Sequence, residues 1–218
     1  MIKSRTAQLV FQSFFVAFGL VGIVASLGLF DKSFSKYFYV YFTNLSNYFC
    51  EIMMIAQLVC TIKKKDDSFV CFAPALNFAG VMSILLTFLV YNLILSPSFP
   101  NLNFQLLSIL FHVVLPVMYV ANWLLFYERK TVRWFFPLVA AVSPITYFAF
   151  VFIRAAHLEF NAHAPHIYPY FFLNLEKLQL VGVMKWSVSL LVCFVAAGYL
   201  LWLADKICGR KHSDRQSV

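Results

Sequence analysis

Two polar residues in apolar stretches, Thr43 and His112, have side chains that could together perform nucleophilic chemistry. A threonine hydroxyl is a weak nucleophile at neutral pH, and an adjacent neutral imidazole can remove its proton. Thr43 lies in the apolar run 37–62, and His112 is the only histidine within a predicted membrane span. Polar groups in lipid lack hydrogen-bond partners unless they face a bundle interior or a water-filled cavity. We therefore predict that Thr43 and His112 meet in a polar pocket within the membrane.

The composition is that of a membrane protein with several spans. The chain has 218 residues, of which 62% are hydrophobic and 12% charged, and its mean hydropathy is +0.79. A soluble domain carries about 25% charged residues. The net charge of +8 could suggest a nucleic-acid partner, but the basic residues lie in short clusters between apolar runs, as topology determinants do. The five cysteines contain no CxxC pair, so they indicate neither a disulfide framework nor a zinc site.

The expected fold is all-α, a bundle of six transmembrane helices in one membrane domain covering 1–218. The predicted spans are 6–30, 37–62, 69–95, 104–126, 134–153 and 186–204. The first apolar stretch exceeds the 7–15 residues of a signal-peptide core, so we expect a retained helix.

Six spans place both termini on one side of the membrane. The termini and the loops after spans two and four carry 12 of the 17 lysines and arginines. Cytoplasmic loops are enriched in these residues, so we predict that both termini are cytoplasmic.

With this topology, several polar side chains fall in one layer of the outer half of the bundle. At 1.5 Å per residue, Thr43 lies roughly 9 Å and His112 roughly 12 Å below the outer surface. Tyr147 is roughly 10 Å deep on the same scale, and Tyr91 falls in the same layer. Ser108 shares a helical face with His112. Together with Asn47, one turn from Thr43, these three residues are candidates for binding the substrate or its oxyanion.

Two local patterns add to this prediction. Thr43, Asn47 and Glu51 are spaced i, i+4, i+8 and form one stripe. Pro116 follows His112 by four residues, so it should free the carbonyl of His112 and bend the helix there. The cytoplasmic half of the bundle looks plainer, with Gln57 and Asn77 as its main polar residues.

Each candidate also has a purely structural interpretation. Thr43 could donate its hydroxyl to the carbonyl of Tyr39, as threonines in membrane helices often do. His112 could bridge two helices. The outer loop contains His157, His163 and His166, whose spacing matches no standard zinc site, so we expect solvated histidines and no metal.

The motifs resemble those of a known family. The chain has FTxxSN in span two, HxxxP in span four and YPYFF in the last outer loop. In this it resembles a family of predicted bacterial six-transmembrane proteins, which is itself similar to the eukaryotic androgen-induced membrane hydrolases. Those enzymes cleave fatty acid esters of hydroxy fatty acids with a threonine nucleophile and a histidine. The resemblance implies these roles for Thr43 and His112, and implies a bacterial cell membrane. Asn174 departs from the bacterial pattern, in which an acid is expected.

The function expected from both lines of reasoning is an intramembrane hydrolase that cleaves a lipid ester. His112 would act as base for Thr43, and no cofactor, metal or nucleic acid would be required. The oligomeric state is left open. The alternative is a transporter or channel for a small solute or proton, in which Glu51 and His112 would line the path.

Overall fold

The computed structural model describes residues 1–30, 32, 34–67, 72–98, 106–158 and 167–213, with side chains described as far as residue 208. Within these ranges the chain is helical and contains no β-strand. The helices and helical turns are α1 (Arg5–Ser26), α2 (Phe42–Lys63), α3 (Pro74–Val90), η1 (Tyr91–Leu95), α4 (Ser96–Ser98), α5 (Leu106–Ile109), η3 (Leu110–Val114), α6 (Leu115–Phe126), α7 (Phe136–Leu158), η4 (Phe171–Leu173) and α8 (Leu175–Ser213).

Six helices are long and apolar enough to cross a membrane, as predicted. They cover Arg5–Ser26, Phe42–Lys63, Pro74–Ser98, Leu106–Phe126, Phe136–Leu158 and Leu175–Cys208. Three of them start at least five residues from the predicted position, and the third begins at Pro74 rather than Phe69. The second begins at Phe42 rather than Tyr37, because residues 36–40 form turns. The last begins at Leu175 rather than Trp186, because Asn174 Oδ1 accepts a hydrogen bond from the Lys177 amide and caps the helix.

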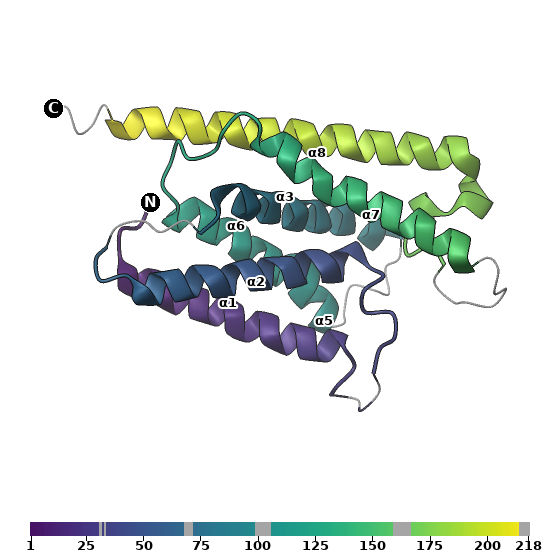
Figure 1. Ribbon diagram of the computed structural model, residues 1–218, viewed down its shortest axis with the longest axis horizontal. Helices are drawn as coiled ribbons and strands as arrows, with labels where there is room; N and C mark the ends of the chain where they lie inside the picture. Colours follow the sequence, from purple (N-terminus) through teal and green to yellow (C-terminus); the bar gives the residue numbers. More distant parts are fainter. Residues whose placement is uncertain (31, 33, 68–71, 99–105, 159–166, 214–218) are drawn as a thin grey trace.

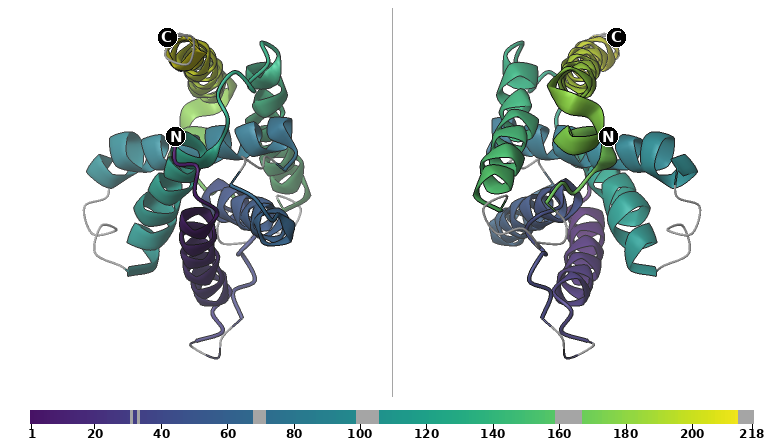
Figure 2. Two further views of the ribbon diagram at one scale, coloured as in Figure 1. Left: turned by 90° about the vertical axis from the view of Figure 1, so that its left-hand side faces the viewer. Right: turned by 90° about the vertical axis from the view of Figure 1, so that its right-hand side faces the viewer.

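The long helices run side by side, and the N-terminus lies at the same end of the bundle as the C-terminal end of α8 (Figure 1). Helix α1 packs on α2 and α6, α3 packs on α2 and α7, and α8 lies along α7. Viewed along the bundle, α8 and α1 lie at opposite edges, with α2, α3 and α6 between them (Figure 2). The start of α2, which carries Thr43, is therefore at the end opposite the termini.

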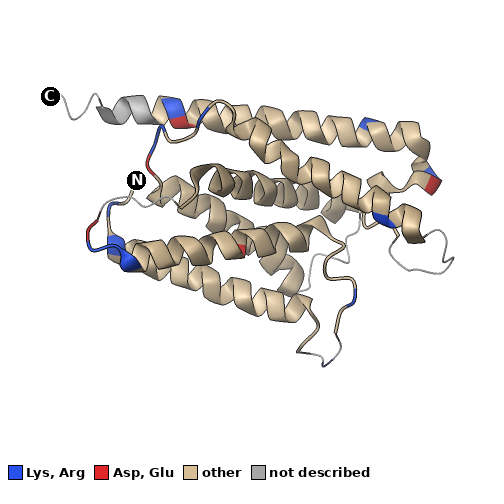
Figure 3. Cartoon of the chain, in the orientation of Figure 1, with Lys and Arg blue, Asp and Glu red and all other residues tan. Residues whose placement is uncertain are grey.

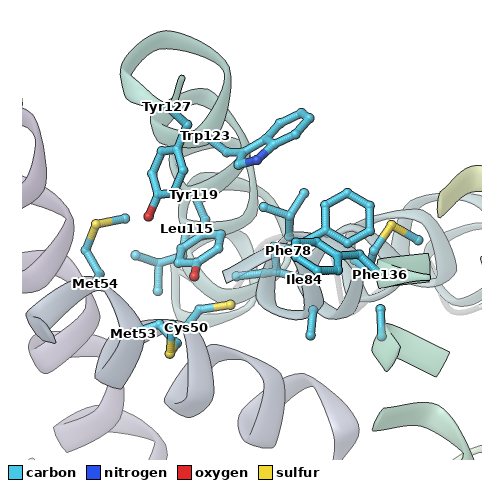
Figure 4. Close-up of a cluster of buried hydrophobic side chains, with 14 of the residues drawn as sticks. Cys50, Met53, Met54, Phe78, Ile84, Leu115, Tyr119, Trp123, Tyr127 and Phe136 are labelled. Carbon is cyan, nitrogen blue, oxygen red and sulfur yellow. The ribbon is translucent and has the colours of Figure 1, made fainter. Parts of the chain in front are cut away.

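Aromatic and sulfur-containing side chains fill the centre of the bundle. Phe78, Trp123 and Phe136, from α3, α6 and α7, pack ring against ring, with centroids 6.2 Å apart in both pairs. Figure 4 shows Cys50 and Met54 of α2 close to Tyr119 of α6 in the same core. This packing fixes the relative positions of α2, α3 and α6, which carry the candidate site.

Charged side chains concentrate at the helix ends and in the loops, and one acidic position lies half-way along α2 (Figure 3). Two sets of hydrogen bonds connect the segments at the end of the bundle where the termini lie. Arg5 donates to the carbonyls of Thr61 and Ile62, and buried Asp205 accepts from the Val132 amide. The side of the membrane on which this end lies remains a prediction from the distribution of basic residues.

The helices α3–η1–α4 and α5–η3–α6 each contain one π-helical turn, η1 and η3. In each, the amide that follows the turn donates to the carbonyl five residues back, Ser96 to Tyr91 and Leu115 to Leu110. A proline comes next, Pro97 or Pro116. Because proline has no amide hydrogen, it cannot supply the following bond of either series. The predicted disturbance around His112 is thus a π turn, a feature that is common at functional sites.

Candidate active site

The structure brings Thr43 and His112 together, as predicted. Thr43 is in the first turn of α2 and His112 is in η3, and the distance from Thr43 Oγ1 to His112 Nε2 is 3.2 Å. Thr43 is buried and His112 is partly buried. Because α2 starts five residues later than predicted, Thr43 is a residue of the helix N-terminus and not of the helix interior.

The imidazole of His112 is oriented by its surroundings. Its Nδ1 lies 2.8 Å from the carbonyl oxygen of Ser108, which can only accept a hydrogen bond, so Nδ1 carries the hydrogen. In the neutral ring, Nε2 is then the acceptor, and the Thr43 hydroxyl donates to it. Tyr91 of η1 stacks on the imidazole, with centroids 3.8 Å apart and planes 18° apart. The hydroxyl of Tyr91 lies 2.9 Å from Ser108 Oγ, so both predicted candidates contact or support His112.

Tyr170 is a site residue that the sequence analysis missed. Its hydroxyl accepts a hydrogen bond from the Thr43 amide at 3.4 Å and lies 3.5 Å from Thr43 Oγ1. The ring of Tyr170 stacks on Phe172, with centroids 5.2 Å apart. Burial raises the pKa of the Tyr170 hydroxyl, so this group remains a hydrogen-bond donor at neutral pH. The signal in the sequence was the YPYFF motif, which we interpreted only as an interfacial aromatic cluster.

Backbone amides also converge on the site. The first amides of a helix have no carbonyl partner within the helix and carry a partial positive charge. Thr43 is the second residue of α2, and its amide points to the Tyr170 hydroxyl. The start of α2 thus holds the Tyr170 hydroxyl beside that of Thr43, which suits the stabilisation of a developing oxyanion.

Asn47 is near the site but is committed to the backbone. Its Nδ2 donates to the carbonyl of Thr43 at 2.8 Å and to that of Phe111 at 3.1 Å. The second bond explains the π turn, because the Leu115 amide is used by Leu110 and Pro116 has no amide hydrogen for Phe111. The carbonyl that receives a side-chain donor is therefore that of Phe111. Both hydrogens of Nδ2 are used, which leaves Asn47 a structural role.

Tyr147, the other expected oxyanion donor, donates its hydroxyl to the carbonyl of Val40 at 2.9 Å. Its ring packs edge-on against Phe42, with centroids 5.1 Å apart. These contacts fix the turn that leads into α2. Tyr147 thus positions the helix start, and its hydroxyl is committed to a backbone carbonyl.

Cavities lie on two sides of Thr43. One, of about 450 Å³, has Thr43, His112, Ser108, Tyr91 and Ser26 in its wall and contains most of the polar groups of the site. The other is more enclosed and mostly apolar. It is lined by parts of α2, α3, α7 and α8, namely Phe42, Thr43, Leu86, Thr87, Val90, Leu95, Pro144, Tyr147, Phe148, Tyr170, Phe172, Leu190 and Leu191. Thr43 and Tyr170 belong to both walls, so Thr43 is at a boundary between a polar and an apolar space.

The half of the bundle nearer the termini is more polar than predicted. Besides the expected Gln57 and Asn77, the side chains of Gln8, Gln12 and Asn122 are buried there. Gln12 donates to Asn122 at 3.3 Å, and Tyr127 donates to Gln57 at 2.9 Å. We expected few polar residues in this half, and that expectation was wrong. Polar residues of α1 and α6 pair with each other across the helix interface, and such pairs cannot be recognised when each span is considered alone.

The described residues contain no group of three or more His, Cys, Asp or Glu that could hold a metal ion. His157 is exposed near the end of α7. His163 and His166 lie outside the described residues, so the expectation for the outer-loop histidines stays a prediction.

Comparison with known proteins gives no relative. No protein-family model, curated protein or solved structure matches the chain.

Proposed function

We propose that this protein is an intramembrane hydrolase that cleaves a lipid ester, with Thr43 as nucleophile and His112 as base. The observation that carries the proposal is the chain of contacts from the Ser108 carbonyl through both nitrogens of His112 to Thr43 Oγ1. It combines a nucleophile, a base in the required tautomer and a group that orients the base, which is the general arrangement of an activated hydroxyl nucleophile.

The proposed reaction has two stages. In the first, Thr43 Oγ1 attacks the ester carbonyl carbon while His112 Nε2 takes the hydroxyl proton and returns it to the leaving alcohol. In the second, His112 activates a water that hydrolyses the acyl-threonine and releases the acid. The hydroxyl of Tyr170, which accepts from the Thr43 amide and keeps its own hydrogen to donate, is positioned to stabilise the negative charge on the carbonyl oxygen.

The cavities limit where a lipid-like substrate can bind. The apolar cavity, of about 40 Å³, has room for only a small apolar group beside Thr43, so the ester and the attacking water suit the larger polar cavity that contains His112. The motif resemblance to the androgen-induced membrane hydrolases points to the same class of reaction. Localisation in a bacterial cell membrane rests on that resemblance alone.

The test is covalent labelling with an alkyl fluorophosphonate, which reacts with activated hydroxyl nucleophiles. We expect labelling of the wild-type protein in membranes, none for Thr43→Ala or His112→Ala, and partial labelling for Thr43→Ser. Two matched controls are Thr146→Ala and His157→Ala, because both residues are exposed on α7 and away from the site. Absence of labelling in folded wild-type protein, or equal labelling of Thr43→Ala, would contradict the proposal.

Transport of a proton or small solute is a second candidate function. It is favoured by the buried polar side chains between α1, α2 and α6, which extend from Glu51 towards the termini. A transporter should lose flux on substitution of Glu51 and tolerate Thr43→Ala. Flux measured in proteoliposomes with these two variants separates the candidates.

A further inference from the structure

Glu51 is a buried carboxyl that the proposed reaction does not use. It lies in the middle of α2, two turns after Thr43, and its exposed fraction is 2%. Neither of its oxygens has a hydrogen-bond partner among the described residues, and none of the described ion pairs includes it. An isolated carboxylate in an apolar interior is so costly that the group takes up a proton instead.

The packing around Glu51 leaves room for the carboxyl itself and little else. A Cβ atom added to Gly19 of α1 would lie 1.9 Å from Glu51 Oε2. Only a glycine at this position permits the close approach of the two helices. The carboxyl of Glu51 therefore lies against the backbone of α1, within the interface of the two helices.

The neutral acid has one suitable partner nearby. Asn47 is one turn earlier on the same face of α2, and its Oδ1 is buried without a hydrogen-bond partner among the described residues. The orientation of Asn47 is fixed, because its Nδ2 donates to the carbonyls of Thr43 and Phe111. A protonated Glu51 supplies the donor that Asn47 Oδ1 lacks, and this single proton satisfies both groups.

The titratable groups nearest to Glu51 along α2 are Cys50 and Tyr48, and neither can carry a positive charge. Tyr119 of α6 lies close to Cys50 in Figure 4. The hydroxyl of Tyr48 lies 2.6 Å from that of Ser26. The buried stripe of α1 consists of Gln8, Gln12, Phe15, Gly19 and Gly22, and none of these can titrate. Among these described residues there is thus no cation that could hold Glu51 in its charged form.

The two directions away from Glu51 differ. Towards the site, Asn47 donates to the carbonyl of Phe111, a residue in the wall of the 450 Å³ cavity. Towards the termini, Phe15 of α1 is buried against Tyr119 of α6, with ring centroids 5.6 Å apart. The pair of Gln12 and Asn122 lies beyond this aromatic layer.

From this arrangement we propose that Glu51 is a proton-binding site, and that its bound proton is donated to Asn47 Oδ1. The ligand is a proton alone, and the inference holds whether or not Thr43 is a nucleophile.

The experiment is infrared spectroscopy of the protein in lipid during transfer to D₂O. We expect a carbonyl-stretch band of a protonated carboxylic acid that is absent in Glu51→Gln. We expect this band to shift to higher frequency in Asn47→Leu, because the acid hydroxyl then loses its hydrogen-bond acceptor. Gln12→Leu, which changes a buried amide of α1 beyond Phe15, is the matched control and should keep the wild-type band.

Because Asn47→Leu removes two bonds to backbone carbonyls, it can prevent folding. Asn47→Ser is the second variant, since serine can still bond to the carbonyl one turn back but cannot reach Glu51. Two results would overturn the proposal. One is the lack of a protonated-acid band that depends on Glu51, and the other is a band whose frequency neither Asn47 variant changes.

Discussion

At the scale of single residues, His112 is constrained on three sides. The Ser108 carbonyl fixes its tautomer, Tyr91 fixes the plane of its ring, and Thr43 contacts Nε2. A histidine that merely bridges two helices does not need its ring orientation defined so fully. The threonine likewise does not bond to its own helix as the structural interpretation proposed, because at the second position of α2 it has no preceding helical turn.

The role proposed for Tyr170 can be tested without changing Thr43 or His112. Tyr170→Phe keeps the ring and removes the hydroxyl that faces Thr43. Loss of one oxyanion donor costs about 10²–10³ in rate. We expect a drop of at least the lower value in fluorophosphonate labelling rate, with unchanged thermal stability. Tyr168→Phe, in the same segment, serves as control, and a wild-type rate for Tyr170→Phe would remove Tyr170 from the site.

The sequence correctly predicted which residues meet where the prediction used the depth of each residue in the membrane. Thr43 and His112 were expected at one level in the membrane, and they are in contact. The prediction failed for Asn47 and Tyr147, because spacing shows which side chains are near the nucleophile but not whether a backbone carbonyl already occupies their donors. Tyr170 follows an irregular segment, for which neither helical nor strand periodicity gives a direction.

At the scale of elements, the site is built from two π turns that face each other. Tyr91 lies in η1 and His112 in η3, and their rings stack. A π turn adds one residue to the helical repeat and so rotates the side chains that follow it. From the sequence, Pro116 predicts a disturbance of the helix nearby. The extra residue of the π turn cannot be predicted in this way, since the pattern of apolar residues is interrupted for only one turn.

The π turn at His112 can be tested by restoring the missing amide. Pro116→Ala allows a bond from residue 116 to a carbonyl in the preceding turn, and so favours a regular α-helix there. The imidazole would shift relative to Thr43, and a misplacement of about 1 Å can cost roughly 10²-fold in rate. We expect labelling to fall by about that factor while helix content, measured by circular dichroism, is kept.

Pro74→Ala is the matched control for this change. Pro74 is the first residue of α3, where a missing amide costs nothing. If Pro116→Ala labels as fast as Pro74→Ala, the π turn does not position His112.

At the scale of the whole molecule, the six-helix architecture was predictable because length and hydropathy define each span. The helix ends were less so. The loop before α8 is shorter than expected, because the apolar segment that begins at Leu175 includes Glu176, Lys177 and Lys185, whose charges masked it in the sequence. Gln179, at a φ of 53°, interrupts the regular helix in this segment.

The orientation of the molecule is a prediction that can be tested directly. We expect both termini in the cytoplasm, because 12 of the 17 lysines and arginines lie in the termini and in the two loops on the same side of the membrane as the termini. Single cysteines introduced at position 3 and in the 36–39 turn of a cysteine-free variant should react with an impermeant maleimide only from opposite sides. Reaction of position 3 from outside intact cells would show that the topology is inverted.

Helix α8 has a consequence for the lipid around the protein. After Gln179 it continues to Cys208, a length of roughly 43 Å, whereas the hydrocarbon core of a bilayer is about 30 Å thick. Large apolar side chains are exposed along it from Leu180 to Ile207. Its uncharged stretch between Lys185 and Asp205, 19 residues or roughly 28 Å long, matches that core, so a thinner or thicker bilayer would tilt or shift the helix. Because α8 also provides Leu190 and Leu191 to the apolar wall beside Thr43, bilayer thickness would be transmitted to the shape of that cavity.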